Sequence, residues 1–437
     1  MKASSEKLNA IDKYKKFISS EKVNFFKKYG MDFVMGDRKG SYIYDLDAKK
    51  ELINLHCNGG VFNLGHRNTE IIDILKKSLE DLDIGNHHLI SRERAELATV
   101  LSNLMPGDLN YTIFGVSGGE AVDLALKVAR GYTKRSDIIS VNGGYHGHTG
   151  LALAAGDEKY REPFKSSIPG FKQVPFNNLK ALKNASGNNT AAIILETIPA
   201  TLGIQIPGKK YIQGVRKLCD ELEILLIMDE VQTGLGRTGK LWAFEHFDII
   251  PDIVVLGKGL SGGIYPISAT VIREPLESVF HKDPFIHIST FGGSELGCRV
   301  GKRVLEISSS SEFLNEVNSL AEYFNQGFEK LINNHKGFLI GLRQMGLMMG
   351  IEMKDELCGP VLTKTAYDNG LLMVYANNDK SVCQCLPPLN MSTEEMDIVF
   401  IKLDKALKSA RKLRKLYGAK QKIDNFKNRL ISKGDSS

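Results

Sequence analysis

The sequence predicts an α/β fold built on a mainly parallel sheet, and two stretches carry this prediction. Residues 224–228 are an uninterrupted apolar run, typical of a strand buried on both faces, and Asp229 and Glu230 follow it directly. A second run, residues 252–256, leads to Lys258. Because ligands of open α/β sheets bind beyond the carboxyl ends of the strands, we expect a ligand site at Asp229 and Lys258.

The first hundred residues predict short elements that precede this sheet. Residues 8–26 have a helical pattern, and residues 41–45 show the two-residue alternation of a strand. The loop at residues 57–66, CNGGVFNLGH, contains glycines that allow close approach of the backbone to a ligand. Residues 68–82 and 92–104 have the spacing of amphipathic helices.

Residues 111–130 predict a strand, a tight turn and a helix. The strand reads YTIF, the turn GVSGG, and apolar residues recur at helical spacing after Glu120. Two interpretations of the turn are open from these residues alone. The N–H groups of Gly118 and Gly119 at the helix start form a phosphate site, or Ser117 is the nucleophile of a G-x-S-x-G elbow, as in α/β-hydrolases.

The remaining elements continue the alternation of strands and helices. Residues 137–141 and 191–196 are apolar runs that predict buried strands, and the second run ends in Glu196. A further helix starts at Ser294, and residues 346–352 predict an edge strand. These elements complete the α/β pattern.

Charge and composition predict an ordinary folded protein that does not bind nucleic acid. The chain has 437 residues, of which 42% are hydrophobic and 25% charged, and its net charge is +6. Residues 402–437 contain twelve Lys or Arg and three Asp, so the positive charge is concentrated in the C-terminal tail. We interpret this tail as a solvated helix face.

Cysteine usage and the absence of apolar segments predict a cytoplasmic protein without a membrane partner. The cysteines have no CxxC or zinc-type spacing and are expected to be free thiols in a reducing compartment. They are Cys57, Cys219, Cys298, Cys358, Cys383 and Cys385. We see neither a signal peptide nor a run of about eighteen apolar residues. His87 and His88 lack an acidic partner at helical spacing, so we expect no metal site.

An acid and a lysine at two strand ends suit one cofactor, pyridoxal phosphate. A carboxylate that keeps the pyridine nitrogen protonated makes the ring an electron sink, and a lysine forms a Schiff base with the aldehyde. This gives Asp229 and Lys258 roles that a Ser117 hydrolase leaves unexplained. Residues 234–239 also spell G-x-G-x-x-G, but Leu241 stands where a P-loop has Ser or Thr, so we expect no nucleotide site.

The motifs Asp229-Glu-Val-Gln-Thr-Gly and Gly-Lys258-Gly resemble those of the class III aminotransferases, the family of ornithine, acetylornithine and 4-aminobutyrate aminotransferases. The resemblance covers most of the chain. It implies that Lys258 carries the Schiff base, Asp229 pairs with the pyridine nitrogen, Val231 contacts the ring and Gln232 lies near the ring hydroxyl. It also implies a stacking role for Tyr145. The other implied cofactor contacts are Gly118, Gly119, Glu196 and Thr290.

The resemblance also implies the architecture and the assembly. The expected fold is fold type I, with a seven-stranded, mainly parallel sheet in a large domain at residues 61–300. A smaller α+β domain is expected from both chain ends, residues 1–60 and 301–437, including the basic helical tail. In the family, the threonine that corresponds to Thr290 reaches the cofactor phosphate of the neighbouring subunit. This implies a homodimer with shared active sites.

Two positions depart from the family pattern. The family commonly has a glutamate in the loop after Glu196 and an arginine three residues before the Pro-Pro pair, where this chain has Thr201 and Gln384. Losing both members of an ion pair leaves no unpaired charge. We hypothesise that a substrate carboxylate is not held in the usual way. Candidate substrate contacts are Val61, Phe62, Arg92 and Gln384, with Arg94, Arg161 and Arg343 as further candidates for a carboxylate.

We therefore predict an aminotransferase that moves an amino group from a small amine or amino acid to a keto acid by a ping-pong mechanism. Two alternatives stay open. The same cofactor chemistry serves racemases, epimerases, lyases and decarboxylases of this family, and the Ser117 hydrolase is an alternative of another class.

Overall fold

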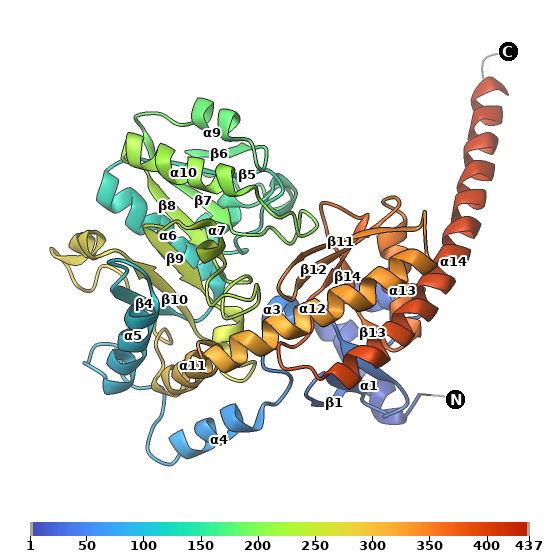
Figure 1. Cartoon of the computed structure of the whole chain (residues 1–437), viewed down its shortest axis with the longest axis horizontal. Helices are drawn as coiled ribbons and strands as arrows, with labels where there is room; N and C mark the ends of the chain where they lie inside the picture. Colours follow the sequence, from blue (N-terminus) through green and yellow to red (C-terminus); the bar gives the residue numbers. More distant parts are fainter. Residues whose placement is uncertain (1–2, 435–437) are drawn as a thin grey trace.

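A seven-stranded sheet lies at the centre of the larger part of the molecule, in a computed structural model that describes residues 3–434 and side chains to residue 416 (Figure 1). Its strand order is β4-β10-β9-β8-β7-β5-β6. The strands are β4 Tyr111–Gly115, β5 Asp137–Val141, β6 Phe171–Val174, β7 Thr190–Glu196, β8 Leu225–Asp229, β9 Ile253–Leu256 and β10 Ser268–Ile272. The five strands from β9 to β6 run parallel, and β10 is antiparallel to β4 and β9. The predicted mainly parallel sheet is confirmed.

The central strands are apolar runs because both faces of the sheet are covered. Every residue of β8 is buried. Leu226 and Met228 pack into one core, whereas Leu225 and Ile227 pack into the core on the opposite face. Helix α10 (Lys209–Leu222) packs into the first of these cores and α6 (Gly118–Thr133) into the second. A strand between two helical layers has no polar face.

Of the other six helices of this part, the sequence predicted those at residues 69–78, 92–104 and 295–308, and it did not predict the remaining three. The six are α4 Thr69–Ser78, α5 Arg92–Leu104, α7 Gly150–Ala155, α8 Glu158–Arg161, α9 Leu179–Ala185 and α11 Glu295–Ser308. Short 3-10 helices are η1 Glu162–Phe164, η2 Ala243–Phe247, η3 Lys258–Ser261 and η4 Glu274–Phe280. Only a 3-10 helix follows the glycines at residues 234–239, so the long helix that a P-loop precedes is not formed there.

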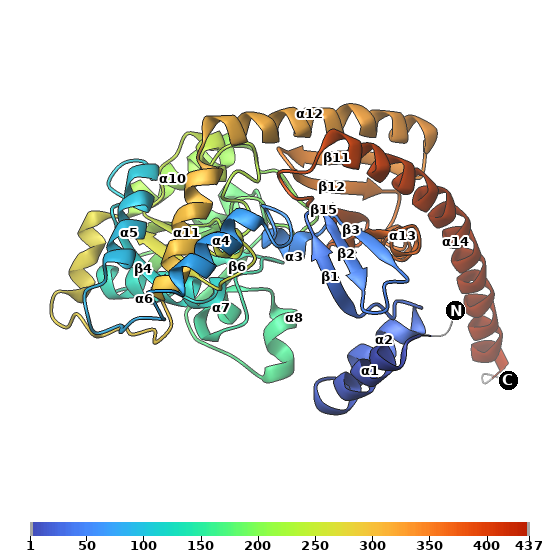
Figure 2. The same ribbon diagram turned by 90° about the horizontal axis from the view of Figure 1, so that it is seen from below.

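Two four-stranded sheets form the smaller part, with the orders β1-β2-β3-β13 and β11-β12-β15-β14 (Figure 2). The strands are β1 Met35–Lys39, β2 Tyr42–Asp45, β3 Glu51–Asn54, β11 Leu339–Met345, β12 Met348–Met353, β13 Leu371–Leu372, β14 Val374–Tyr375 and β15 Val382–Cys385. Because β3 pairs with β13, the expected α+β part from both chain ends is confirmed. The prediction of an edge strand at residues 346–352 is wrong about its position in the sheet. Strand β12 forms there, but it pairs with β11 on one side and β15 on the other.

Helices from both chain ends pack around these sheets. They are α1 Ser5–Phe17, α2 Ser20–Lys28, α3 Cys57–Gly60, α12 Ser311–Asn334, α13 Cys358–Asp368 and α14 Thr393–Gly434. A buried ion pair between Lys7 and Asp45, 2.6 Å long, attaches α1 to β2. The end of α14 projects from the body (Figure 1); the basic side chains of the tail beyond residue 416 lie outside the described residues. Within the described part of the chain, no helix is both long and apolar enough to cross a membrane.

Candidate active site

A cavity of about 360 Å³ opens beyond the carboxyl ends of β7, β8 and β9. Its walls come from the β4–α6 turn, the β5–α7 loop and the three strand ends. The lining residues are Ser117, Gly118, Gly119, Tyr145, His146, Gly147, His148, Thr149, Glu196, Ile198, Asp229, Val231, Gln232, Thr233 and Lys258. The structure therefore brings together eight of the predicted site residues: Gly118, Gly119, Tyr145, Glu196, Asp229, Val231, Gln232 and Lys258.

Lys258 lies just beyond β9, with its amine directed at Gln232. Its Nζ donates a hydrogen bond of 2.9 Å to Gln232 Oε1. Its backbone φ of 40° is in the left-handed region, a strained conformation that is common at functional sites. Loss of water lowers the pKa of the Lys258 amine, although the charges of Asp229 and Glu196 oppose this shift. A lowered pKa makes the uncharged, nucleophilic amine more accessible.

Asp229 ends β8 and is held by a histidine. Its Oδ2 is 2.8 Å from His146 Nδ1, and its Oδ1 accepts a 3.1 Å hydrogen bond from the N–H of Val231. Burial alone would lower the pKa of His146, but the hydrogen bond and charge of Asp229 raise it overall. The sequence analysis missed His146, although this residue directly follows Tyr145, which was predicted to stack on the cofactor. Two cavity residues thus form one buried hydrogen-bonded pair.

Glu196 ends β7, beside Asp229 in the parallel register. Its Oε1 accepts a 2.8 Å hydrogen bond from the N–H of Tyr145. Burial raises the pKa of Glu196 to about 7, and the neighbouring Asp229 carboxylate adds to the shift while His146 opposes it. Glu196 therefore exchanges its proton near neutral pH.

Glu230 has another role although it adjoins Asp229. Its carboxylate accepts hydrogen bonds from Thr233 Oγ1 at 2.8 Å and from the N–H groups of Ala243 and Phe244 at 3.0 Å. Successive strand residues point to opposite faces. Glu230 therefore fixes the loop that follows β8 and leaves the cavity to Asp229.

The start of α6 faces the cavity with glycines that the packing requires. A Cβ on Gly118 would lie 2.9 Å from Val231 Cγ1, and one on Gly119 would lie 2.9 Å from Thr149 Oγ1. The helix N-terminus thus presents its N–H groups to the cavity, a favourable site for an anion. Ser117 Oγ accepts a hydrogen bond from the N–H of Glu120, and in the described residues no histidine bonds to it. That environment does not activate a serine nucleophile.

Five predicted residues lie outside this cavity in the single chain, namely Val61, Phe62, Thr290, Gln384 and Arg92. Val61 directly follows α3, and the Phe62 ring packs on His66 with ring centroids 3.9 Å apart. Thr290 is exposed in a segment before α11. Their proposed contacts to substrate and cofactor stay predictions.

The two residues that depart from the family pattern lie on neighbouring segments. Gln384, buried on β15, has its Nε2 3.4 Å from the carbonyl oxygen of Ala200. The hydroxyl of the adjacent Thr201 donates to the carbonyl of Gly143 at 2.8 Å. Both side chains are therefore engaged by backbone atoms.

The four arginines considered for a substrate carboxylate all contact protein groups. Arg92 donates to Glu93 at 2.7 Å, and Arg343 donates to Glu352 and Asp379 at 2.7 and 3.0 Å. The other two, Arg94 and Arg161, donate to backbone carbonyls. None of the four lines the cavity.

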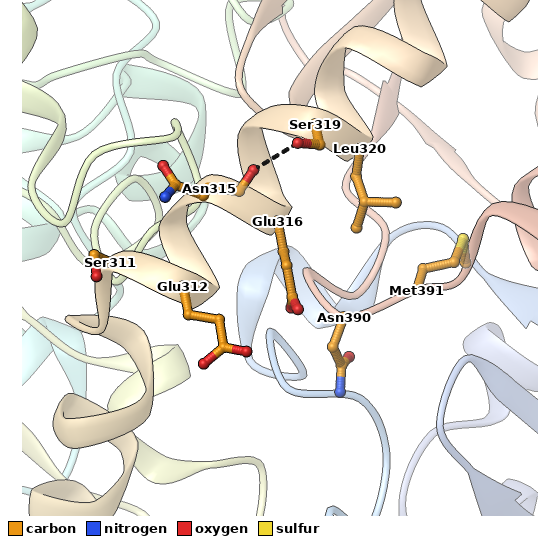
Figure 3. A pocket seen from close by; sticks show the side chains of 8 residues that line it. All are labelled: Ser311, Glu312, Asn315, Glu316, Ser319, Leu320, Asn390 and Met391. Carbon is orange, nitrogen blue, oxygen red and sulfur yellow. Dashed lines mark hydrogen bonds between the residues drawn. The ribbon is translucent and has the colours of Figure 1, made fainter.

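A larger hollow, of about 680 Å³, lies beside α12 (Figure 3). Figure 3 shows Glu312 and Glu316 on α12 and Asn390 on the segment opposite. None of the predicted site residues lines it. The lysine, carboxylates and helix N-terminus that define the candidate active site are all in the smaller cavity.

Comparison with known proteins identifies the family. The model of the family "Aminotransferase class-III" matches residues 27–407. The chain belongs to the class III aminotransferases. An uncharacterized aminotransferase of Archaeoglobus fulgidus is 52% identical over 410 residues, which cover 94% of this chain and 96% of that protein. The chain is therefore an enzyme of the aminotransferase type, as predicted.

Solved structures confirm the fold of this class III aminotransferase. An ornithine aminotransferase from Toxoplasma gondii ME49 superposes with a TM-score of 0.84 at 24% identity, over 94% of this chain and 96% of that one. A taurine:2-oxoglutarate aminotransferase from Bifidobacterium kashiwanohense, in complex with PLP and glutamate, gives 0.80 at 25% identity, over 86% and 92%. The expected fold type I is confirmed.

Proposed function

We propose that the cavity beside Lys258 binds pyridoxal phosphate and that the enzyme transfers an amino group from an amine or amino acid to a keto acid in two half-reactions. The observation that carries this proposal is the convergence of a lysine amine, a buried carboxylate and a glycine-rich helix N-terminus in one cavity. A lysine supplies the Schiff-base nitrogen, a carboxylate suits a protonated pyridine, and the helix start suits a phosphate.

The residues present fit the shape and charge of this cofactor. Gly118 and Gly119 stand in the first turn of α6, where the backbone N–H groups would bind the phosphate. Asp229, oriented by His146, would hold the pyridine nitrogen. Val231 would contact one face of the ring, and Tyr145 would stack on the other. Gln232 would lie at the ring hydroxyl. Glu196 is the remaining proposed cofactor contact in the cavity.

Lys258 is the proposed proton carrier. When bound, the cofactor supplies an electron sink for the negative charge that develops on the substrate carbon. Lys258 Nζ would accept the proton from that carbon and deliver it to the aldehyde carbon of the cofactor. An amine with a lowered pKa suits this proton transfer. Gln232 Oε1, which accepts a hydrogen bond of 2.9 Å from Nζ, would orient the amine.

A visible absorption spectrum tests the proposal. The protein is reconstituted with pyridoxal phosphate, and amines and amino acids are added one at a time without a keto acid. We expect a visible band of the lysine-bound cofactor that bleaches with the true amino donor. If the band persists while an enantiopure amino acid loses optical rotation, the enzyme is a racemase. The absence of a band would contradict the proposal.

We further propose a homodimer in which Thr290 reaches the neighbouring active site. Two segments on either side of Arg94 expose apolar side chains, as an interface does. These side chains are Ile84, Leu89, Ile90, Phe285, Ile286, Ile288 and Phe291. Arg94 joins the segments, donating to the carbonyl of Gly293 at 2.7 Å and to that of Asn86 at 3.0 Å. Light scattering should give twice the chain mass, and Thr290→Val should weaken cofactor binding. A monomer with full activity would contradict this proposal.

We also propose a cytoplasmic location and a division into residues 1–60, 61–300 and 301–437. All six cysteines are buried free thiols, which supports a reducing compartment. The neutral side chains of Thr201 and Gln384 support the hypothesis that a substrate carboxylate is bound without an ion pair at those two positions.

A further inference from the structure

Arg237, in the loop that follows β8, is a fully buried cation. Every hydrogen bond that its guanidinium makes in the described part of the chain goes to a neutral oxygen atom. Burial lowers the pKa of Arg237 to about 10. The neighbouring thiols of Cys57 and Cys385 supply no compensating charge, because burial raises the pKa of both and keeps them protonated. Burying such a charge is costly, so its hydrogen bonds indicate what the cation holds together.

The guanidinium joins three segments that are far apart in sequence. Its Nη1 donates to the carbonyl of Leu347, between β11 and β12, at 3.1 Å and to that of Pro387, just after β15, at 2.7 Å. Its Nη2 donates to Asn63 Oδ1, in the segment after α3, at 2.7 Å. The N–H of Leu347 also donates to the carbonyl of Arg237 at 2.9 Å. Arg237 therefore connects the loop after β8 to the smaller part of the molecule.

Asn63 packs against the residues that adjoin the reactive lysine. A Cβ on Gly259, the residue after Lys258, would lie 3.0 Å from Asn63 Nδ2 and 3.2 Å from the carbonyl oxygen of Gly60. A Cβ on Gly60 would lie 3.4 Å from Asn63 Oδ1, the atom to which Arg237 donates. The Asn63 amide therefore lies between the turn at residues 57–60 and the start of η3, which begins at Lys258.

The same turn approaches the lysine amine itself. A Cβ on Gly59 would lie 3.3 Å from Lys258 Nζ and 3.6 Å from Gln232 Nε2. Two other residues of the turn, Cys57 and Asn58, have positive φ angles of 49° and 51°. Such a conformation is strained and persists only where its surroundings enforce it. The burial that lowers the pKa of the Lys258 amine therefore depends on this turn staying in place.

We propose that Arg237 is a positioning residue, whose hydrogen bond to Asn63 holds the strained turn at residues 57–60 against Lys258. Arg237 does not line the cavity and acts through Asn63. A guanidinium suits this role because its planar fork donates in several fixed directions at once, which a lysine amine does not reproduce. This inference rests on the proposed function, because it assumes that Lys258 is the reactive amine.

Hydrogen–deuterium exchange at residues 56–66 of the full-length protein, without cofactor, tests whether this bond holds the turn. The N–H groups of Gly59 and Phe62 bond within the turn, to the carbonyls of His56 and Cys57. We expect Arg237→Lys and Asn63→Ala to speed their exchange by about tenfold or more, the effect of losing one hydrogen bond to a charged group. Asn63→Ala keeps the other two bonds of Arg237, so it provides the test even if Arg237→Lys does not fold.

Three further variants serve as controls. Asn63→Asp keeps an acceptor oxygen for Arg237 and should exchange as wild type does. The double variant of Arg237→Lys and Asn63→Ala should exchange no faster than Arg237→Lys alone, because both changes remove the same bond. Arg216→Lys disturbs an arginine that donates to Asp252, before β9, whereas Lys258 lies beyond the other end of that strand. Its turn should exchange as in wild type.

A pH titration of the visible cofactor band separates positioning from stability. In protein loaded with pyridoxal phosphate, Asn63→Ala should raise the pH midpoint of the band by about half a unit or more, because water then reaches the lysine nitrogen. Arg216→Lys should lower the melting temperature and leave the midpoint unchanged. Asp229, Glu196 and His56, the titratable groups that interact with the charge of Lys258, are common to these proteins.

Two results would overturn the inference. One is unchanged exchange at the turn in Asn63→Ala, and the other is a band midpoint that stays at the wild-type value in that variant. The exchange measurement needs no cofactor, so it tests the hold of Arg237 on the turn by itself. Absence of the visible band in loaded wild type would instead contradict the proposed function.

Discussion

Two regions near the candidate active site are built in different ways. On one wall, Glu196, Asp229 and Lys258 lie at or just beyond the ends of three parallel strands, whose spacing is set by the hydrogen bonds of a single sheet. The other region consists of the turn after β3, whose Gly59 approaches Lys258, and of β15, whose Gln384 contacts the loop after β7. Side chain to backbone hydrogen bonds hold both segments. The hydrogen bonds of one sheet fix the spacing of the strand ends. The positions of separate segments depend instead on the individual residues that join them. We infer that the first serves the common chemistry and the second serves selectivity.

The sharpest test of this comparison is removal of the amine. Lys258→Ala should lower turnover by at least about 10³-fold, because proton transfer alone contributes roughly 10²–10⁴-fold. The visible band of the lysine-bound cofactor should disappear. Single-turnover kinetics and the spectrum measure both effects. Turnover near that of wild type would show that the sheet wall is not the catalytic one.

Asp229→Asn should have the next largest effect. The carboxylate charge of Asp229 would keep the pyridine nitrogen protonated, which makes the ring an electron sink. Removing this charge should slow the first half-reaction by about 10²-fold or more. Glu230→Gln is the matched control on the next residue. Because Glu230 holds a loop and faces away from the cavity, that variant should lower the melting temperature while folded protein keeps its rate. Equal rate losses in the two variants would contradict the assignment.

Glu196→Gln should change the pH dependence of stability. The pKa of Glu196 is raised to about 7 in the folded protein, so the folded state binds more protons than the unfolded state between about pH 4.5 and 7. The free energy of unfolding therefore falls as pH rises through this window, by up to about 3 kcal/mol. Denaturation of the cofactor-free protein at pH 5 and pH 8 should show a smaller fall in Glu196→Gln. The exposed Glu322→Gln should behave as wild type, and an unchanged slope in Glu196→Gln would refute the prediction.

Gln384→Ala should have the smallest effect. The variant loses one neutral hydrogen bond to the Ala200 carbonyl, worth about 1 kcal/mol of stability. The KM for the keto acid should change by less than about threefold, as steady-state kinetics can measure. A collapse of keto-acid binding would show that Gln384 itself holds the carboxylate.

Much of the sheet wall was predictable because its residues follow apolar runs without interruption. Asp229 and Lys258 were identified as strand-end residues, and the structure places them in one cavity with Gln232. The expected edge strand at residues 346–352 failed for a physical reason. Its partner β15 comes from a separate segment, and local alternation does not reveal which strands pair across a sheet.

The sequence by itself determined the α/β class, the lysine and carboxylate of the site, and the glycines at the start of α6. These features depend on local patterns of 2 to 4 residues and on motifs that are contiguous in the chain. Only the tertiary structure placed His146 on Asp229 and Gly59 against Lys258. Those contacts join segments far apart in sequence. Their geometry depends on how strands and turns are arranged in three dimensions, for which no single segment carries a signal.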